Sequence, residues 1–451
     1  MTFDGPVSAI AKFAASVATS DLNQEDVTGA VRHHFDAVSC AMYGFAEPAS
    51  QIVRSVAKAT MSDSGCSVFG VAGKVAPEQA VFANSTMVRQ LDFNDVSDAP
   101  GHPSDFIPAI FAAGEIGGAS GLDVIRAIFV GYEVFEALGA SYAMFPAGWD
   151  TTLFIGIAAA MGAGSIFGLT FEELANAVAL AMVPSVPLLC TRHGLLSNWK
   201  DSAAAHAAMN GLFAARLART GLTGPSAPFE GADGLHRHVS PEKDLVIGTL
   251  KDGRSAVARC PVKYYPTSSA SMGLIDPLIS VRARFAVEDI AKISAEQSER
   301  AWKIIGGGSS DREEKWNPKS RETADHSLPF IVAVSLLDGD VTRESYLPER
   351  LADPKVLALM QLISTAPRDG LHDFEPQLKI ELRNGEVIDV ASSAPAGDRR
   401  NPIDNGRLSR KFGQASDGLL SVTARSDLEA TLWDLADMKD LSGLTKYYRA
   451  I

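Results

Sequence analysis

The chain has 451 residues, more than one ordinary hydrophobic core accommodates, so its length predicts two domains. Hydrophobic residues make up 46% of it and charged residues 21%, a composition typical of soluble globular proteins that excludes a disordered or fibrous chain. The net charge of −13 argues against nucleic-acid binding, which needs a basic surface, but not against an anionic small substrate, because a cleft can carry local positive charge.

The termini, the most apolar segment and the cysteines indicate the environment of the protein. The N-terminus, MTFDGPVSAIAKF, has an early Asp and no continuous apolar stretch, so we do not expect it to act as a secretory signal. Residues 154–169 are too few to span a membrane and rich in Ala and Gly, which favours a buried, closely packed helix. We therefore expect a cytoplasmic protein that binds no membrane. The cysteines form no Cys-x-x-Cys pair and indicate buried free thiols rather than disulfides or a zinc site; they are Cys40, Cys66, Cys190 and Cys260.

Up to about residue 225, the sequence predicts a bundle of Ala-rich helices. Apolar residues recur at spacings of three and four, and the connecting segments are short. The first such segment, residues 27–44, ends on Gly44, a residue typical of the position just beyond a helix. The same pattern recurs in residues 77–91, 123–138, 171–183 and 199–220.

Between about residues 225 and 266 the pattern changes. Residues 377–392 alternate apolar and polar on both sides of Asn384–Gly385, which predicts a β-hairpin with a two-residue turn. From residue 401 onwards, helical periodicity returns. We further expect an extended segment at residues 262–266 and a strand followed by a polar loop at residues 289–307. Two helices are expected at residues 328–339 and 354–364.

These elements predict a mainly α fold with a smaller α+β domain. Residues 1–259 are expected to form a large helical domain, and residues 260–394 an inserted α+β lid domain. Residues 395–451 are expected to pack back on the helical domain. The interface between body and lid leaves a cleft, a common place for a small-molecule site.

The stretch LDFNDVSDAPGHPSD, residues 91–105, concentrates acid/base side chains around a Pro100–Gly101 break, directly before the apolar helical segment 106–117. We interpret Asp98 and Asp105 as loop and N-cap residues, and Asp92 and His102 as candidates for proton transfer. A histidine that only bonds a backbone carbonyl is the alternative for His102. A metal site from Asp92, Asp95 and His102 matches no specific metal template, and we expect no metal here.

Cationic side chains that could bind a carboxylate occur at several places. Lys200 lies in a small, apolar helix start, NWKDSAAAHAAM, where loss of water favours a base or a carboxylate clamp; a surface lysine is the alternative. Of the arginines, Arg192 is the one that we select as a substrate ligand; the other candidates are Arg89, Arg399 and Arg400.

Seven blocks occur in order along nearly the whole chain: MVRQLDFNDVSDAPGHPSD, GWDTTLF, NWKDSAAAHAAMNG, TGPSAPFEG, VKYYP, KWNPKSRETADHSLPF and AVSLLDG. Together they resemble the MmgE/PrpD family, which includes 2-methylcitrate dehydratase, cis-aconitate decarboxylase and iminodisuccinate epimerase. The resemblance implies a large helical domain with a lid, usually a homodimer, and neither metal nor organic cofactor. The WKDS, TGPSAPFEG and KWNPKSRETADHSLPF blocks are nearer to the dehydratase side.

The resemblance also implies roles for individual residues. Asp92, His102 and Lys200 match catalytic positions of the family. The lysine of the VKYYP block is expected to bind a substrate carboxylate, with a salt-bridged hinge lysine as the alternative, and His326 is either catalytic or a helix cap. The full set of expected substrate-binding residues is Lys263, Arg192, Asp150, Tyr265 and His326.

The sequence departs from the family where other members carry histidines. Decarboxylases have a histidine at the position of Asp150, and dehydratases often have Asp-His where this chain has Asp150–Thr151. Residues 267–272, TSSASM, lack the histidine that often follows the YP pair, and Val96 stands where many members have threonine.

We expect a lyase that removes a proton next to a carboxylate and expels a hydroxyl group, with a 2-methylcitrate-like acid as substrate. His102 would be the acid/base and Asp92 its partner, while Lys200 and Lys263 hold carboxylates and the lid excludes water. Three alternatives remain: an epimerase of an iminodisuccinate-like acid, a decarboxylase, and an inactive family scaffold.

Overall fold

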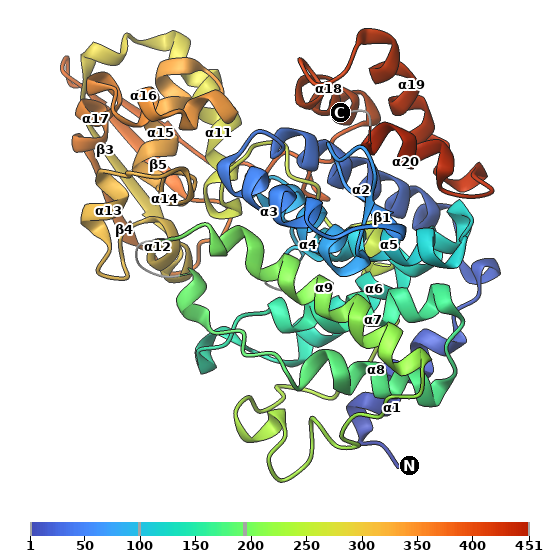
Figure 1. Cartoon of the computed structure of the whole chain (residues 1–451). Helices are drawn as coiled ribbons and strands as arrows, with labels where there is room; N and C mark the ends of the chain where they lie inside the picture. Colours follow the sequence, from blue (N-terminus) through green and yellow to red (C-terminus); the bar gives the residue numbers. More distant parts are fainter. Residues whose placement is uncertain (1, 98–100, 193–195, 450–451) are drawn as a thin grey trace.

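The computed structural model, which describes residues 2–97, 101–192 and 196–449, has a large helical part and a smaller α+β part. Figure 1 draws the helical part in blue to green and the α+β part in yellow to orange. The expected fold class, mainly α with a smaller α+β domain, is confirmed. Expected elements on residues 98–100, including Asp98 and Pro100, lie outside the described residues.

The helical part contains a short ribbon of two antiparallel strands, β1 (Met61–Ser67) and β2 (Lys74–Val75), that the sequence did not predict. Its helices are α1 (Gly5–Ser16), α2 (Gln24–Tyr43), α3 (Pro48–Lys58), α4 (Pro77–Arg89), α5 (Ile107–Gly117), α6 (Gly121–Ser141), α7 (Thr152–Phe167), α8 (Phe171–Met182), α9 (Trp199–Arg219) and α10 (Ala256–Arg259).

Helix α7 lies at the centre of this part, in contact with α5, α6, α8 and α9. Every residue from Thr152 to Ser165 is buried, so the apolar run is a core helix, as expected. A Cβ atom on Gly211 of α9 would lie 2.3 Å from the carbonyl oxygen of Gly156, so glycines let the two helix backbones approach closely. Among the described residues, no helix is both long and apolar enough to cross a membrane.

The α+β part packs helices around a four-stranded sheet of order β4-β3-β5-β6. Strand β3 pairs parallel with β4 and antiparallel with β5, which in turn pairs antiparallel with β6. Its elements are α11 (Ser269–Val281), β3 (Ile290–Gln297), α12 (Glu299–Ile305), α13 (Arg312–Trp316), α14 (Arg321–Ala324), α15 (Leu328–Asp338), α16 (Pro348–Leu351), α17 (Pro354–Gln361), β4 (Ile363–Pro367), β5 (Gln377–Leu382) and β6 (Val387–Val390).

Two local expectations for this part were wrong. The segment after β3 is not a polar loop but helix α12, whose N-cap Ser298 accepts a hydrogen bond from the backbone N–H of Ala301. The hairpin turn has three residues rather than two, because Glu381 pairs with Val387 and Gly385 N–H donates to Leu382 O. Gly385 has φ +88°, as the third residue of such a loop requires.

The C-terminal helices α18 (Asn405–Ala415), α19 (Val422–Trp433) and α20 (Ser442–Tyr448) return to the helical part, and α18 and α19 contact α2 (Figure 1). Lys411 of α18 anchors this contact, because its buried ammonium lies 2.7 Å from the Asp36 carboxylate of α2. Chain segments from both ends of the sequence therefore share one core.

Two smaller expectations also need correction. Gly44 follows α2 but has φ −74°, so its ordinary right-handed conformation does not need glycine; its backbone instead lies against α4, where a Cβ would meet Met87 O at 2.4 Å. Of the four cysteines, Cys40 and Cys66 are buried as expected, whereas Cys190 is exposed and Cys260 half-buried.

Candidate active site

A cavity of about 190 Å³ lies between the helical and the α+β parts, where the sequence predicted a cleft. The helical part contributes the C-terminal end of α4, the N-cap residue of α7 and the first turn of α9, and the α+β part contributes the start of α11 and one side of α12. Six lysines and arginines and four aspartates are among its described lining residues, so the cavity is cationic in a protein of net charge −13. Such a local excess suits an anionic ligand.

His102 faces this cavity from the loop before the 3₁₀ helix η2 (Pro103–Phe106). Its Nδ1 lies 2.5 Å from the carbonyl oxygen of Asp95, which can only accept, so Nδ1 carries the proton and Nε2 a lone pair. Burial, reinforced by Arg89, holds the pKa of His102 well below its ordinary value, so the ring is neutral. A neutral imidazole with Nε2 at a cavity is a general base.

Asp92 lies 3.4 Å from His102 Nε2 and is held by two buried cations. Its Oδ2 accepts a hydrogen bond of 3.0 Å from Lys263 Nζ, and its Oδ1 accepts one from Arg89 Nη1. Burial alone would raise the pKa of Asp92, but Arg89 and Lys263 hold it well below its ordinary value. The residue has φ +49°, an uncommon conformation that Asp tolerates better than most residues. The carboxylate is therefore poised beside any imidazolium that His102 forms.

Asp105 is not an N-cap, contrary to expectation. It is buried within η2, where it accepts a 2.8 Å hydrogen bond from Asn94 and lies 3.6 Å from Arg89 Nε. Burial raises its pKa to about 7. The side chain thus belongs to the network that holds the 91–105 loop.

A second His–Asp pair reaches the cavity from the α+β part. Asp325 and His326 connect α14 to α15, and His326 Nδ1 lies 2.5 Å from Asp325 Oδ1. The buried ammonium of Lys200, on the first turn of α9, donates to both Asp325 oxygens at 3.1 and 3.2 Å. Burial and, to a smaller extent, the positive charge of Lys200 lower the pKa of His326 to about 4. Lys200 thus faces a carboxylate rather than only alanines, and it joins the two parts of the molecule.

Asp150 and Arg192 line the cavity as an ion pair. Arg192 Nε donates to Asp150 Oδ2 at 2.8 Å, and Arg192 Nη1 donates to Lys200 O at 2.9 Å. The other oxygen of Asp150 accepts from the backbone N–H of Thr152 at the start of α7. Asp150 therefore holds Arg192, whose side chain is 20% exposed, at the cavity wall.

Not every residue selected from the sequence reaches the cavity. Tyr265 is buried elsewhere, with its hydroxyl donating to Asp276, and Lys263 lies behind Asp92 rather than on the cavity wall. Arg399 and Arg400 pair with Asp252 and Asp398 on the surface, outside this cavity. The structure thus brings together Asp92, His102, Asp150, Arg192, Lys200 and His326.

Three cavity cations were not selected from the sequence. Arg300 and Lys303 lie on α12, which was interpreted as a loop, and buried Lys315 lies on α13, 3.5 Å from Asp311. The serine followed by a charged and apolar run at residues 298–305 is an N-cap signal that would have identified α12.

The positions at which the sequence departs from its family also line the cavity. They are Val96, Asp150, Thr151 and, within the TSSASM segment, Ser268, Ser269 and Ala270. Residues 269–272 of this segment form the start of helix α11. Apart from Asp150, these wall positions carry only aliphatic and hydroxyl side chains.

Comparison with known proteins agrees with this arrangement. Residues 8–247 match the MmgE/PrpD N-terminal domain, and residues 265–435 match the MmgE/PrpD C-terminal domain. The chain is 24% identical to a cis-aconitate decarboxylase of Aspergillus terreus, over 98% of this chain and 95% of that protein. It is 26% identical to a 2-methylcitrate dehydratase of Cupriavidus necator (81% and 80% covered) and 27% identical to that of Salmonella typhi (84% and 83%). With both domains matched, the chain belongs to the MmgE/PrpD family.

Proposed function

We propose that this protein is a lyase that acts without a cofactor on a small di- or tricarboxylic acid, by dehydrating a 2-methylcitrate-like hydroxy acid. The observation that carries the proposal is the neutral His102, whose Nε2 faces a cationic cavity beside the Asp92 carboxylate. The named relatives are decarboxylases and dehydratases, which are lyases, and this supports the reaction class.

In the proposed reaction, His102 Nε2 removes the proton from the carbon next to a substrate carboxylate. The resulting imidazolium is stabilised by the Asp92 carboxylate, which lies 3.4 Å from Nε2, the atom that takes the proton. Arg192 and Lys200 neutralise the charge that develops on the carboxylate. As the C–O bond breaks, the imidazolium returns its proton to the leaving hydroxyl, so the products are an alkene and water.

For Lys263 we propose the alternative role, that of a salt-bridged lysine at the junction of the two parts. Its ammonium contacts the side chain and the backbone carbonyl of Asp92, so it positions Asp92 rather than a substrate carboxylate. Val96, Thr151, Ser268 and Ser269 line the same cavity, which supports a substrate that differs from those of the named relatives. Homodimer formation and a cytoplasmic location remain predictions from the sequence.

An epimerase is the second candidate, and the two His–Asp pairs favour it. His102 and His326 reach the cavity from different parts of the molecule, and burial lowers the pKa of both. In this reaction one histidine, neutral, removes a proton from one face of a carbon, and the other, as the imidazolium, donates its proton to the opposite face. This reaction has no leaving group, so it predicts deuterium at the α-carbon in D₂O without an alkene.

Proton NMR in D₂O tests both candidates, with a panel of 2-methylcitrate, citrate, cis-aconitate and iminodisuccinate isomers. An alkene signal from a hydroxy acid supports the dehydratase, and α-deuteration without alkene supports the epimerase. The His102→Asn variant keeps a side-chain donor toward Asp95 O but has no base, so turnover should fall by about 10²–10⁴-fold. His206→Asn, an exposed residue of α9, is the matched control. Near-normal turnover of His102→Asn contradicts the proposal.

A further inference from the structure

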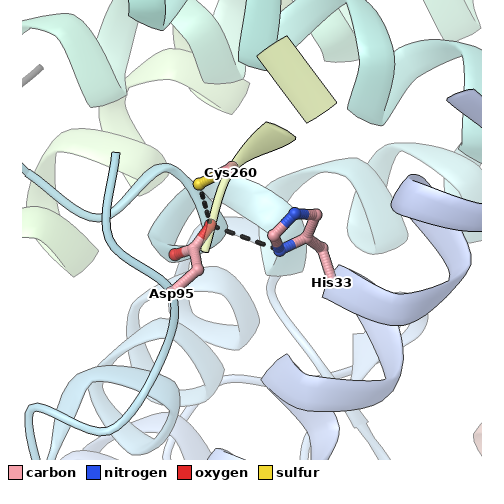
Figure 2. Close-up of side chains that lie close together, drawn as sticks. All are labelled: His33, Asp95 and Cys260. Carbon is pink, nitrogen blue, oxygen red and sulfur yellow. Dashed lines mark hydrogen bonds and ion pairs between the residues drawn. The ribbon is translucent and has the colours of Figure 1, made fainter. Parts of the chain in front are cut away.

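Outside the active site, His33, Asp95 and Cys260 come together from three separate segments. His33 lies on α2, Asp95 in the loop before η2, and Cys260 directly after α10 (Figure 2). Asp95 Oδ2 lies 3.5 Å from His33 Nδ1 and 3.5 Å from Cys260 Sγ, and the three ligand atoms lie within 4.8 Å of one another. Nitrogen, oxygen and sulfur donors that converge in this way are a set that zinc accepts.

The tautomer of His33 makes this cluster more than a hydrogen-bonded core. Its Nε2 lies 3.1 Å from the carbonyl oxygen of Val257, which can only accept, so Nε2 carries the proton. In this tautomer Nδ1 carries the lone pair, and it lies 3.5 Å from the Asp95 carboxylate. Nδ1 is buried and has no hydrogen-bond partner among the described residues. A cation between the two groups would accept a lone pair from each.

We propose that His33, Asp95 and Cys260 bind a Zn²⁺ ion. Zinc bonds of ordinary length in a tetrahedral arrangement hold ligand atoms about 3.4–3.6 Å apart, close to the two 3.5 Å separations from Asp95 Oδ2. Binding displaces the thiol proton of Cys260 to solvent, so the thiolate and the carboxylate balance the charge of the ion.

The surroundings of Asp95 leave room for this role. Oδ1 accepts hydrogen bonds from the backbone N–H and hydroxyl of Ser104, and Oδ2 accepts one of 2.6 Å from the Tyr132 hydroxyl. These bonds orient the carboxylate and still leave Oδ2 a second lone pair. His33 and Cys260, but not Asp95, also line a second cavity of about 500 Å³, from which the ion and a water as fourth ligand would enter.

The position of the site indicates a structural role. The carboxylate of Asp95 would bind the ion, while its backbone carbonyl accepts from His102 Nδ1 at 2.5 Å. An ion here would therefore join α2 and the segment after α10 to the loop that carries the proposed base. This inference does not depend on the reaction proposed above.

Metal titration of the full-length protein tests the site. After treatment with EDTA and dialysis, the protein is titrated with Co²⁺ and with Zn²⁺. We expect one Co²⁺ per chain with the near-ultraviolet charge-transfer absorption of a thiolate ligand, displacement by Zn²⁺, and a higher thermal midpoint with Zn²⁺. Because the thiolate band is measured on the unchanged protein, the result does not depend on a variant that folds.

Variants then assign the ligands. Cys260→Ser and His33→Gln should each lose the stoichiometric ion, whereas Cys190→Ser, which removes the exposed thiol, should keep it. Unfolding curves recorded in EDTA check that each variant is folded. The site is refuted by the absence of bound metal at tenfold excess, by binding that survives in Cys260→Ser and His33→Gln, or by a thiolate band that Cys190→Ser abolishes.

Discussion

Replacing Asp92 by Asn removes one negative charge from a site that holds two buried cations. The φ of +49° is compatible with Asn, and the side chain keeps its shape, so the change isolates the charge. Lys263 Nζ lies 3.0 Å from Asp92 Oδ2, which at an effective dielectric constant near 20 gives an attraction of about 5.5 kcal/mol before desolvation. Since both cations remain buried, we expect the free energy of unfolding to fall by about 3–5 kcal/mol.

A double-mutant cycle with Lys263→Met separates this pair from other effects of the substitution. The loss caused by Asp92→Asn should be smaller by about 2–3 kcal/mol when Lys263 is already methionine, because one of the two stranded cations is then absent. Urea unfolding at pH 7, followed by circular dichroism and by tryptophan fluorescence, measures the four proteins. Coincidence of the two curves checks that unfolding is two-state.

Asp150→Asn is the matched control. Asp150 is as buried as Asp92, but its cation, Arg192, is 20% exposed and can turn toward water in the cavity, so a loss of only about 1–2 kcal/mol is expected. If Asp92→Asn changed stability by less than about 1 kcal/mol, or if the cycle were additive, the ion cluster would not hold the 91–105 loop as argued here.

Three further predictions concern the core and the cavity. Burial raises the pKa of Glu133 from 4.5 to about 7, so the folded state binds a proton more tightly than the unfolded state, and the free energy of unfolding falls as the pH rises from about 4.5 to 7. The Glu133→Gln variant should lose up to about 3 kcal/mol of this fall, and the exposed control Glu172→Gln none of it, as measured by urea unfolding at pH 4.5 and pH 8. Gly211→Ala places a methyl group 2.3 Å from a carbonyl oxygen of α7, so the free energy of unfolding should fall by about 1–3 kcal/mol. The control Gly413→Ala, whose methyl group meets nothing within 4 Å, should raise the free energy of unfolding by up to about 1 kcal/mol. Equal shifts of the thermal midpoint in the two variants would contradict the close approach of α7 and α9. Arg192→Gln should raise KM about 10–100-fold with a smaller change in kcat if it binds a substrate carboxylate, and an unchanged KM in steady-state kinetics would exclude that role.

The sequence by itself determined the elements whose causes are local. The apolar periodicity of α4, α6, α8 and α9 identifies them as helices, and the composition of α7 identifies a buried one. The order of the family blocks along the chain also located the 91–105 loop and the start of α9. Local reasoning failed for α12, where charged residues hid an N-cap signal, and for the hairpin, where strand register rather than the Asn-Gly pair decided the loop length.

Only the tertiary structure decided which partner each charged side chain has. Lys200 meets Asp325 and Lys263 meets Asp92, pairs that are 125 and 171 residues apart in the sequence. The VKYYP pattern could not tell that Tyr265 turns away from the cavity toward Asp276. A cysteine with no Cys-x-x-Cys neighbour gave no sign of a metal site, because its candidate co-ligands come from α2 and from the loop before η2. Residue type supplies the chemistry of an ionisable group, but the charges that surround it depend on how distant segments pack.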